Sequence, residues 1–128
     1  MAKRYELRKA SDGQYFFTLH ADNNEKILTS EMYKAKPGAE NGIASVKTNV
    51  ANESRFDRRT SKAGKPYFVL KAANGEVIST SEEYSSIEAM ENGIAAVRQA
   101  APMATTDDRT EGSSGQKQAP RLRRGALL

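Results

Sequence analysis

The chain has 128 residues and a formal net charge of +4, with 20 lysines and arginines against 16 acidic residues. It lacks cysteine, which excludes disulfides, thiolate nucleophiles and thiolate metal ligands. No apolar run approaches the ~20 residues needed to span a bilayer, and the first residues lead directly into a strand-like pattern instead of a signal peptide. We therefore expect a cytoplasmic protein with no membrane segment.

About half of the positive surplus falls in the last part of the chain. Residues 102–128 hold five basic and three acidic side chains, which gives about +2. The rest of the chain is only mildly basic, which favours solubility more than a strong attraction for nucleic acid.

The sequence matches itself without a gap after a shift of 51 positions. Between residues 5–50 and 56–101, 18 of 46 aligned positions are identical. The agreement is closest where Glu40–Val46 meets Glu91–Val97. A match of this length indicates an internal duplication.

Each unit predicts three strands. Residues 5–9 alternate apolar with charged side chains, as a half-buried strand does. After a glycine turn comes a second strand, Tyr15–Ala21, in which Phe17 and Leu19 recur in the second unit and therefore mark the core face. A tight hairpin leads to the third strand, Ile27–Ser30. The second unit repeats this order with a turn at Lys62–Gly64, a strand at Tyr67–Ala72, a hairpin at Asn74–Gly75 and a strand at Val77–Ser81.

A helix closes each unit. Pro37 suits the first turn of the first helix, and Ser85 with Glu88 forms a capping-box pattern for the second. Gly42 and Gly93 lie inside these helices, where glycine is unfavourable, so we expect the helix backbone to approach the sheet closely there.

One unit of about 50 residues is too small for an independent core. We therefore predict an α+β fold in which tandem β-β-β-α repeats, residues 3–50 and 54–101, pack about a pseudo-two-fold axis into one compact domain, with helices against an antiparallel sheet. Such a chain would be a monomer with internal pseudo-symmetry. Residues 102–128 lack periodicity and are predicted to be a disordered tail, with a short basic cluster at Arg121–Arg124.

The repeated pattern resembles the YegP-like family of bacterial proteins. The resemblance covers residues 3–101 and is carried by Tyr5–Leu7, Gly13–Phe17, Tyr33 and the helical run Glu40–Lys47, and again by Phe56–Arg98. It implies a small tandem-repeat α+β domain. The family is uncharacterised, so the resemblance implies no reaction, cofactor or partner.

An enzyme is not indicated. The single histidine, His20, falls on the outer face of a predicted strand and has Lys71 as its counterpart in the second repeat. No histidines or carboxylates show metal-ligand spacing, and no glycine-rich loop precedes a helix. We predict no catalytic residue, no metal site and no cofactor.

Nucleic-acid binding is one alternative. The first strand of each repeat is basic, and aromatic residues follow it, which together resemble a sheet that stacks bases. Strand alternation places Arg4 and Arg8 on one face with Glu6, whose charge weakens a positive stripe. The same arginines would also protect an exposed edge strand from pairing. The candidate contacts are Arg4, Arg8, Arg55, Arg58, Tyr15 and Tyr67.

The favoured function is a non-catalytic protein-interaction or scaffold module with an unidentified protein partner. A duplicated domain without catalytic motifs fits this class, and an exposed sheet edge can accept a partner strand. Four residues recur just before the helices and define a possible repeat-symmetric surface: Ser30, Tyr33, Ser81 and Tyr84. Alternatively, each tyrosine packs over the corner between strand and helix.

Overall fold

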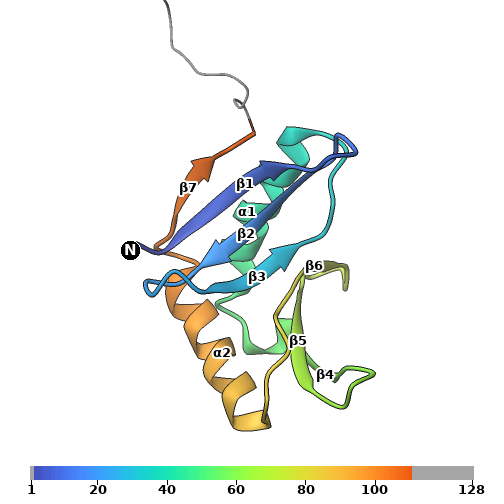
Figure 1. The fold of residues 1–128 in the computed structure, drawn as a ribbon, viewed down its shortest axis with the longest axis vertical. Helices are drawn as coiled ribbons and strands as arrows, with labels where there is room; N and C mark the ends of the chain where they lie inside the picture. The colour runs from blue at the N-terminus through green and yellow to red at the C-terminus, as the bar shows by residue number, and fades with distance from the viewer. Residues whose placement is uncertain (1, 111–128) are drawn as a thin grey trace, which may run out of the picture.

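The computed structural model describes residues 2–110, in which each repeat forms the predicted three strands and helix (Figure 1). The first repeat comprises β1 (Arg4–Lys9), β2 (Tyr15–His20), β3 (Lys26–Ser30) and α1 (Lys36–Asn49). A short 3-10 helix, η1 (Glu53–Arg55), leads into the second repeat. That repeat comprises β4 (Phe56–Thr60), β5 (Pro66–Lys71), β6 (Val77–Thr80) and α2 (Ile87–Ala100), and a further strand, β7 (Thr105–Asp108), follows it.

The turns of the hairpins are built on left-handed residues at matching positions. Gly13 (φ 88°) and Gly64 (φ 82°) turn the first hairpin of each repeat. Asn24 (φ 71°) and Gly75 (φ 87°) turn the second, where glycine and asparagine tolerate a positive φ best. The hairpin predictions are therefore confirmed.

All strands of residues 2–110 belong to one sheet in the order β4-β5-β6-β3-β2-β1-β7. The repeats meet where β3 pairs antiparallel with β6, and Thr29 lies opposite Thr80, its own counterpart 51 positions later. A residue paired with its own counterpart places the pseudo-two-fold axis at this point. The predicted α+β fold of tandem repeats is confirmed; the sheet is mixed only because β7 runs parallel to β1.

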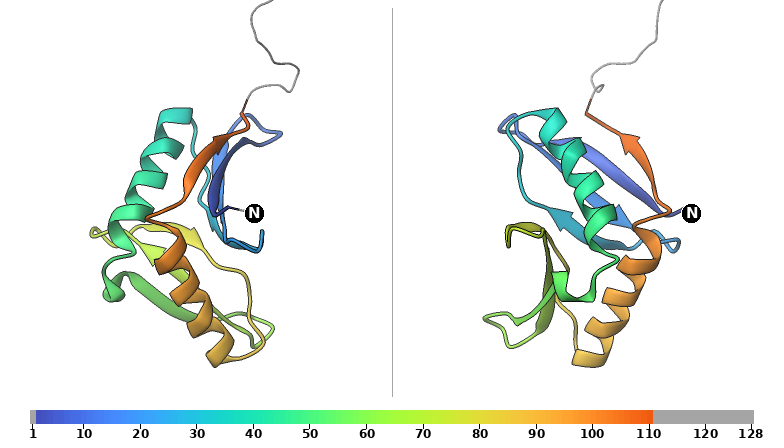
Figure 2. Two further views of the ribbon diagram at one scale, coloured as in Figure 1. Left: turned by 90° about the vertical axis from the view of Figure 1, so that its left-hand side faces the viewer. Right: turned by 180° about the vertical axis from the view of Figure 1, so that it is seen from behind.

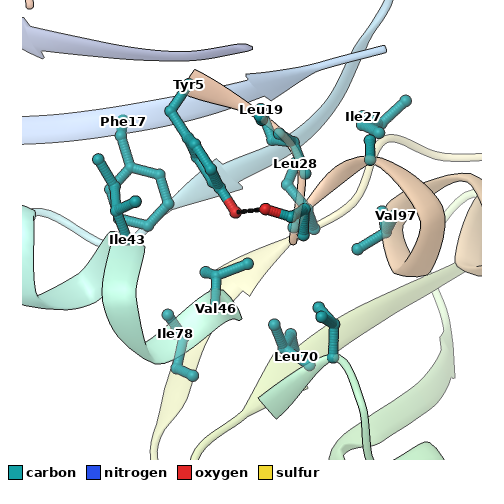
Figure 3. Close-up of a cluster of buried hydrophobic side chains, with 14 of the residues drawn as sticks. Tyr5, Phe17, Leu19, Ile27, Leu28, Ile43, Val46, Leu70, Ile78 and Val97 are labelled. Carbon is teal, nitrogen blue, oxygen red and sulfur yellow. Dashed lines mark hydrogen bonds between the residues drawn. The ribbon is translucent and has the colours of Figure 1, made fainter. Parts of the chain in front are cut away.

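Both helices lie on the same face of the twisted sheet and share one core (Figure 2). Helix α1 contacts strands of both repeats, and α2 contacts β3 as well as β5. Figure 3 shows side chains from both repeats meeting in this cluster, including Phe17, Val46, Leu70 and Val97, all buried. Neither repeat has a core of its own, which is why the two form a single domain.

The start of α2 differs from the prediction by one residue. Ser86, and not Ser85, is the N-cap, and its Oγ accepts a hydrogen bond of 3.0 Å from the N–H of Ala89. Two consecutive serines offer the same chemistry, so the sequence alone does not select between them. Helix α1 begins with Pro37 in its first turn, as predicted.

The glycines inside the helices make room for tyrosine rings. A Cβ on Gly42 would lie 2.5 Å from the hydroxyl oxygen of Tyr33, and one on Gly93 would clash with the hydroxyl of Tyr84. The same tyrosines stack on core phenylalanines, with 6.4 Å between the ring centroids of Tyr33 and Phe17. The predicted close approach is therefore made by a side chain and not by the sheet backbone.

The prediction of a disordered tail from residue 102 is wrong for residues 102–110. Ala101 and Ala104 are buried, and Thr105–Asp108 form β7, which pairs parallel with β1 from Arg4 to Leu7. A polar, aperiodic segment is ordered here because β1 offers it a row of unpaired backbone groups. Residues 111–128, with the basic cluster, lie outside the described residues.

Besides the ladder to β1, further contacts hold residues 101–109 against the first repeat. The buried Tyr5 hydroxyl donates a hydrogen bond of 2.8 Å to the carbonyl oxygen of Ala101 at the end of α2 (Figure 3). The N–H of Arg109 donates to the carbonyl of Leu7 at 2.7 Å. At the far end of the strand, Asp108 forms an ion pair with Lys36 at the start of α1.

The Tyr5 hydroxyl is expected to anchor β7. Replacing Tyr5 with Phe leaves the buried carbonyl of Ala101 without this donor, which should lower the free energy of unfolding by about 1 kcal/mol. Hydrogen exchange of the Arg109 amide, bonded to Leu7, should become faster than in the wild type. Phe56→Tyr, at the matching position of the second repeat, is the control and should leave Arg109 exchange unchanged. Unchanged Arg109 exchange in Tyr5→Phe would show that the hydroxyl does not hold the strand.

Candidate interaction surfaces

The face of the sheet opposite the helices carries a buried carboxylate surrounded by basic groups. Glu6 on β1 is only 3% exposed, and its Oε2 accepts a hydrogen bond of 2.8 Å from Arg4 Nε. Arg8 binds Oε1 through Nε and Nη2. Arg109, just after β7, brings its Nη2 to within 3.6 Å of Oε2. The prediction that Arg4, Glu6 and Arg8 share one face is confirmed.

The arginines keep Glu6 ionised in spite of its burial. Burial alone would raise the pKa of Glu6, but the hydrogen bonds from Arg8 and Arg4 outweigh it and hold the pKa at about 2. The positive charges of Arg4 and Arg8 are therefore partly neutralised by Glu6, which weakens both arginines as contacts for a phosphate, although the Arg8 side chain remains 43% exposed.

His20 belongs to the same cluster. Its Nε2 lies 2.9 Å from Thr18 Oγ1 and 3.7 Å from Glu6 Oε1. Burial lowers the pKa of His20 more than the nearby Glu6 charge raises it. The ring is therefore more enclosed than the exposed polar position that strand alternation alone indicated.

The second repeat has a looser version of this cluster. Asp57, the counterpart of Glu6, accepts a hydrogen bond of 3.1 Å from Arg59 Nε and lies 3.5 Å from Lys71 Nζ. These side chains are 33–40% exposed, in contrast to the buried Glu6. Arg55, the counterpart of Arg4, lies in η1 just before β4, and its buried Nε has no hydrogen-bond partner among the described residues.

The predicted nucleic-acid contacts are divided between the two faces. Alternation along the strands puts Arg4, Arg8 and Tyr67 on the open face. Tyr15 instead packs against the core, and Arg58, the counterpart of the buried Leu7, points to the helix side. The prediction missed Phe16, the counterpart of Tyr67, which lies opposite Arg8 as Tyr67 lies opposite Arg59.

The repeat-symmetric residues use their polar atoms within the fold. Ser30 Oγ accepts a hydrogen bond from the Phe17 N–H at 2.9 Å and donates to the Glu31 carbonyl. Ser81 makes the same two bonds in the second repeat. Together with the tyrosine–glycine packing described above, these bonds give all four residues a structural role in both repeats.

The matching strands β1 and β4 differ in their outer neighbours. The edge of β1 is covered by β7, whereas β4 has β5 as its only strand neighbour within residues 2–110. On β5, both backbone groups of Phe68 bond to Ser81 on the side away from β4. Its partner across the ladder, Arg58, therefore directs its own N–H and C=O to the free edge, as antiparallel alternation requires.

A groove runs along this free edge on the helix side. It is lined by β4, the start of β5 and the first turns of α2, with Arg58, Ile87 and Met90 among its residues. Ile87 is 69% exposed. The guanidinium of Arg58 folds back onto α2, where it binds Glu91 at 2.5 Å and Glu53 at 2.6 Å, so it does not extend beyond the edge.

Residues 2–110 contain no group of three or more histidines and acidic residues placed to hold a metal ion. Within the same residues, no helix has the length and apolar character to cross a membrane.

Comparison with known proteins identifies the family. The model of a domain of unknown function, DUF1508, matches residues 10–57 and again residues 61–108. The chain belongs to the DUF1508 family. The second match ends at Asp108, so β7 is part of the family's repeat.

The relatives are UPF0339 proteins, the YegP-like family that the sequence resembles. One from Acinetobacter baylyi is 51% identical over 110 residues, covering 86% of this chain and 99% of the relative. YegP of Escherichia coli is 46% identical over 86% of this chain and its own full length. The solution NMR structures of YegP from E. coli and of a UPF0339 protein from Shewanella oneidensis match with TM-scores of 0.81 and 0.80, at 46% and 49% identity. Each match covers 86% of this chain, and 95% and 93% of the respective structures. These DUF1508 relatives are described as uncharacterised, and none indicates a catalytic function.

The Glu6 cluster should make stability depend on acid pH. A folded-state pKa near 2, against an ordinary value of 4.5, stabilises the fold fully above about pH 4.5 and loses that contribution as pH falls toward 2. The difference corresponds to about 3 kcal/mol. Urea unfolding between pH 5 and pH 2 should show this loss in the wild type and a flatter profile in Glu6→Gln. Parallel profiles for the two proteins would mean that Glu6 does not govern acid stability.

Proposed function

We propose that this DUF1508 protein is a non-catalytic interaction module that binds an extended segment of a protein partner along the free edge of β4. The observation that carries the proposal is the difference between the two repeats: β7 pairs with the outer side of β1, whereas no strand of residues 2–110 pairs with the matching side of β4. A cytoplasmic, monomeric protein is part of the same proposal, because the chain lacks cysteine and pairs its own repeats.

The backbone of β4 has what strand addition requires. Arg58 presents an N–H and a C=O to the edge, and main-chain hydrogen bonds to such groups give affinity without a deep pocket. The matching carbonyl of the first repeat, that of Leu7, accepts the N–H of Arg109 after β7. The protein therefore contains, at one edge, an example of the interaction proposed for the other.

The β4 edge can be blocked with a matched pair of variants. Arg58→Pro removes the outward N–H without breaking the ladder to β5, because that N–H takes no part in it. Arg58→Ala removes the same ion pairs but keeps the N–H. Quantitative affinity capture from a bacterial lysate should retain a specific set of proteins on the wild type and on Arg58→Ala, and lose that set on Arg58→Pro. Identical capture by all three proteins would contradict a role for the β4 edge.

A nucleic acid is the second candidate, favoured by one observation. The open face carries two equivalent pairs of an arginine and an aromatic ring across neighbouring strands, Arg8 with Phe16 and Arg59 with Tyr67. Arginine and aromatic rings on an open sheet can contact phosphates and stack bases. The ion pairs to Glu6 and Asp57 reduce the charge available, so we rank this function second.

Salt dependence decides this second candidate. In amide NMR titrations of the full chain with short single-stranded DNA and RNA, binding should shift Phe16 and Tyr67 and weaken as salt rises. Arg59→Ala should reduce the shifts, whereas Arg58→Ala, which changes the helix side, should not. No shifts, or shifts that ignore salt, would remove nucleic acid as a candidate.

A further inference from the structure

We infer the side-chain chemistry of the segment that binds at β4: it alternates an acidic residue on the open face of the sheet with an apolar residue on the helix side. This inference rests on the proposed function. The 51-residue repeat relates each position of β4 to a position of β1. The outer side of β1, the occupied edge, pairs with β7, whereas the outer side of β4, the vacant edge, has no neighbouring strand among residues 2–110.

On the helix side of β4, the groove favours an apolar residue of the partner. At the occupied edge, Asp108 of β7 lies opposite Leu7 and forms an ion pair with Lys36, the first residue of α1. In the second repeat, the position of Lys36 is taken by Ile87, the first residue of α2. Ile87 lines the groove beside β4 together with Met90 and is largely exposed. A segment seated like β7 would therefore place an apolar side chain, and not a carboxylate, against Ile87.

On the open face of the sheet, the charges beside β4 favour an acidic residue of the partner. Around Glu6, the carboxylates of Glu6 and Asp107 lie among Arg4, Arg8 and Arg109. The corresponding part of the second repeat has one carboxylate, Asp57, for the two cations Arg59 and Lys71. The vacant edge thus has a surplus of positive charge on the face where β7 supplies Asp107 at the other edge. An acidic side chain from the partner would balance it.

The stretch of β4 backbone that is open to pairing with a partner is short. The N–H of Phe56 is already bonded to the carbonyl of Glu53 in η1, so the start of β4 is closed. The open stretch runs from Arg58 to Thr60, followed by the turn that leads to β5. Two or three residues of the partner therefore pair with the backbone, and one acidic and one apolar position carry the specificity.

The test uses synthetic peptides based on residues 101–110, which include β7. The first has the natural sequence, the second carries Asp108→Leu, and the third carries Asp108→Leu with Asp107→Lys. Each is titrated into the full isotope-labelled chain and followed by amide NMR. The second peptide should shift amides of β4 and Ile87 and bind about tenfold more tightly than the first, because it buries an apolar side chain against Ile87. The third should bind more weakly than the second, with the difference shrinking as salt rises.

A substitution at Ile87 tests the predicted apolar position of the partner directly. Ile87→Lys recreates the arrangement of Lys36, so this variant should prefer the natural peptide, with its aspartate, over the leucine peptide. Ile87 is exposed, so this substitution should leave the fold intact, which the amide spectrum verifies directly. Reversal of the preference supports the inference.

The outcomes separate this inference from the proposed function. If all peptides shift β4 equally and Ile87→Lys changes nothing, the edge binds strands but the side-chain assignment is wrong. If the β4 shifts persist in Arg58→Pro, edge pairing itself is wrong. Shifts confined to β1, or no shifts at β4 with any peptide, overturn the inference, and the lysate capture then decides the proposed function independently.

Discussion

The antiparallel pairing of β3 with β6 is the contact on which the rest of the structure depends. It joins two units, each too small for its own core, into one sheet with all helices on one face. Because Thr29 pairs with its own counterpart, Thr80, this junction also fixes the symmetry of the molecule. Corresponding residues of the two repeats can then be compared directly, and each difference between them is a local departure from one shared design.

The most important departures concern the two outer strands. Tyr5 has a hydroxyl that binds the end of α2, whereas its counterpart is Phe56. The carbonyl of Val50, equivalent to that of Ala101, accepts a hydrogen bond from Arg98 instead. The chain after α1 passes through η1 into β4, while the chain after α2 continues past the sheet as β7. A duplicated sequence has thus given β1 a second neighbouring strand and has left the matching side of β4 without one among residues 2–110, which is where we propose that a partner binds.

Much of the fold follows from the sequence because the repeat reports each position twice. The recurrence of Phe17 and Leu19 identifies the core face from the sequence, and glycine and asparagine at matching positions predict the left-handed turns. The strand β7 could not be predicted in this way, since a short polar run is stable only through the edge that receives it. That Arg58 and Tyr15 lie on the other face from the remaining candidates could have been predicted from the sequence. The shift of 51 aligns Arg58 with the core residue Leu7, and it aligns Tyr67 with Phe16 and not with Tyr15. Candidates chosen by charge and aromatic character alone do not distinguish the two faces of the sheet.

The position of β7 also has a consequence for synthesis on the ribosome. The hydrogen bond between Tyr5 and Ala101 joins residues 96 positions apart. The outer side of β1 is therefore covered only after nearly all of the described chain has been synthesised. Until then a nascent chain exposes the outer sides of both β1 and β4 to pairing with other chains. Once β7 has formed, the outer side of β1 is no longer available to other chains, whereas the matching side of β4 still has no neighbouring strand among residues 2–110.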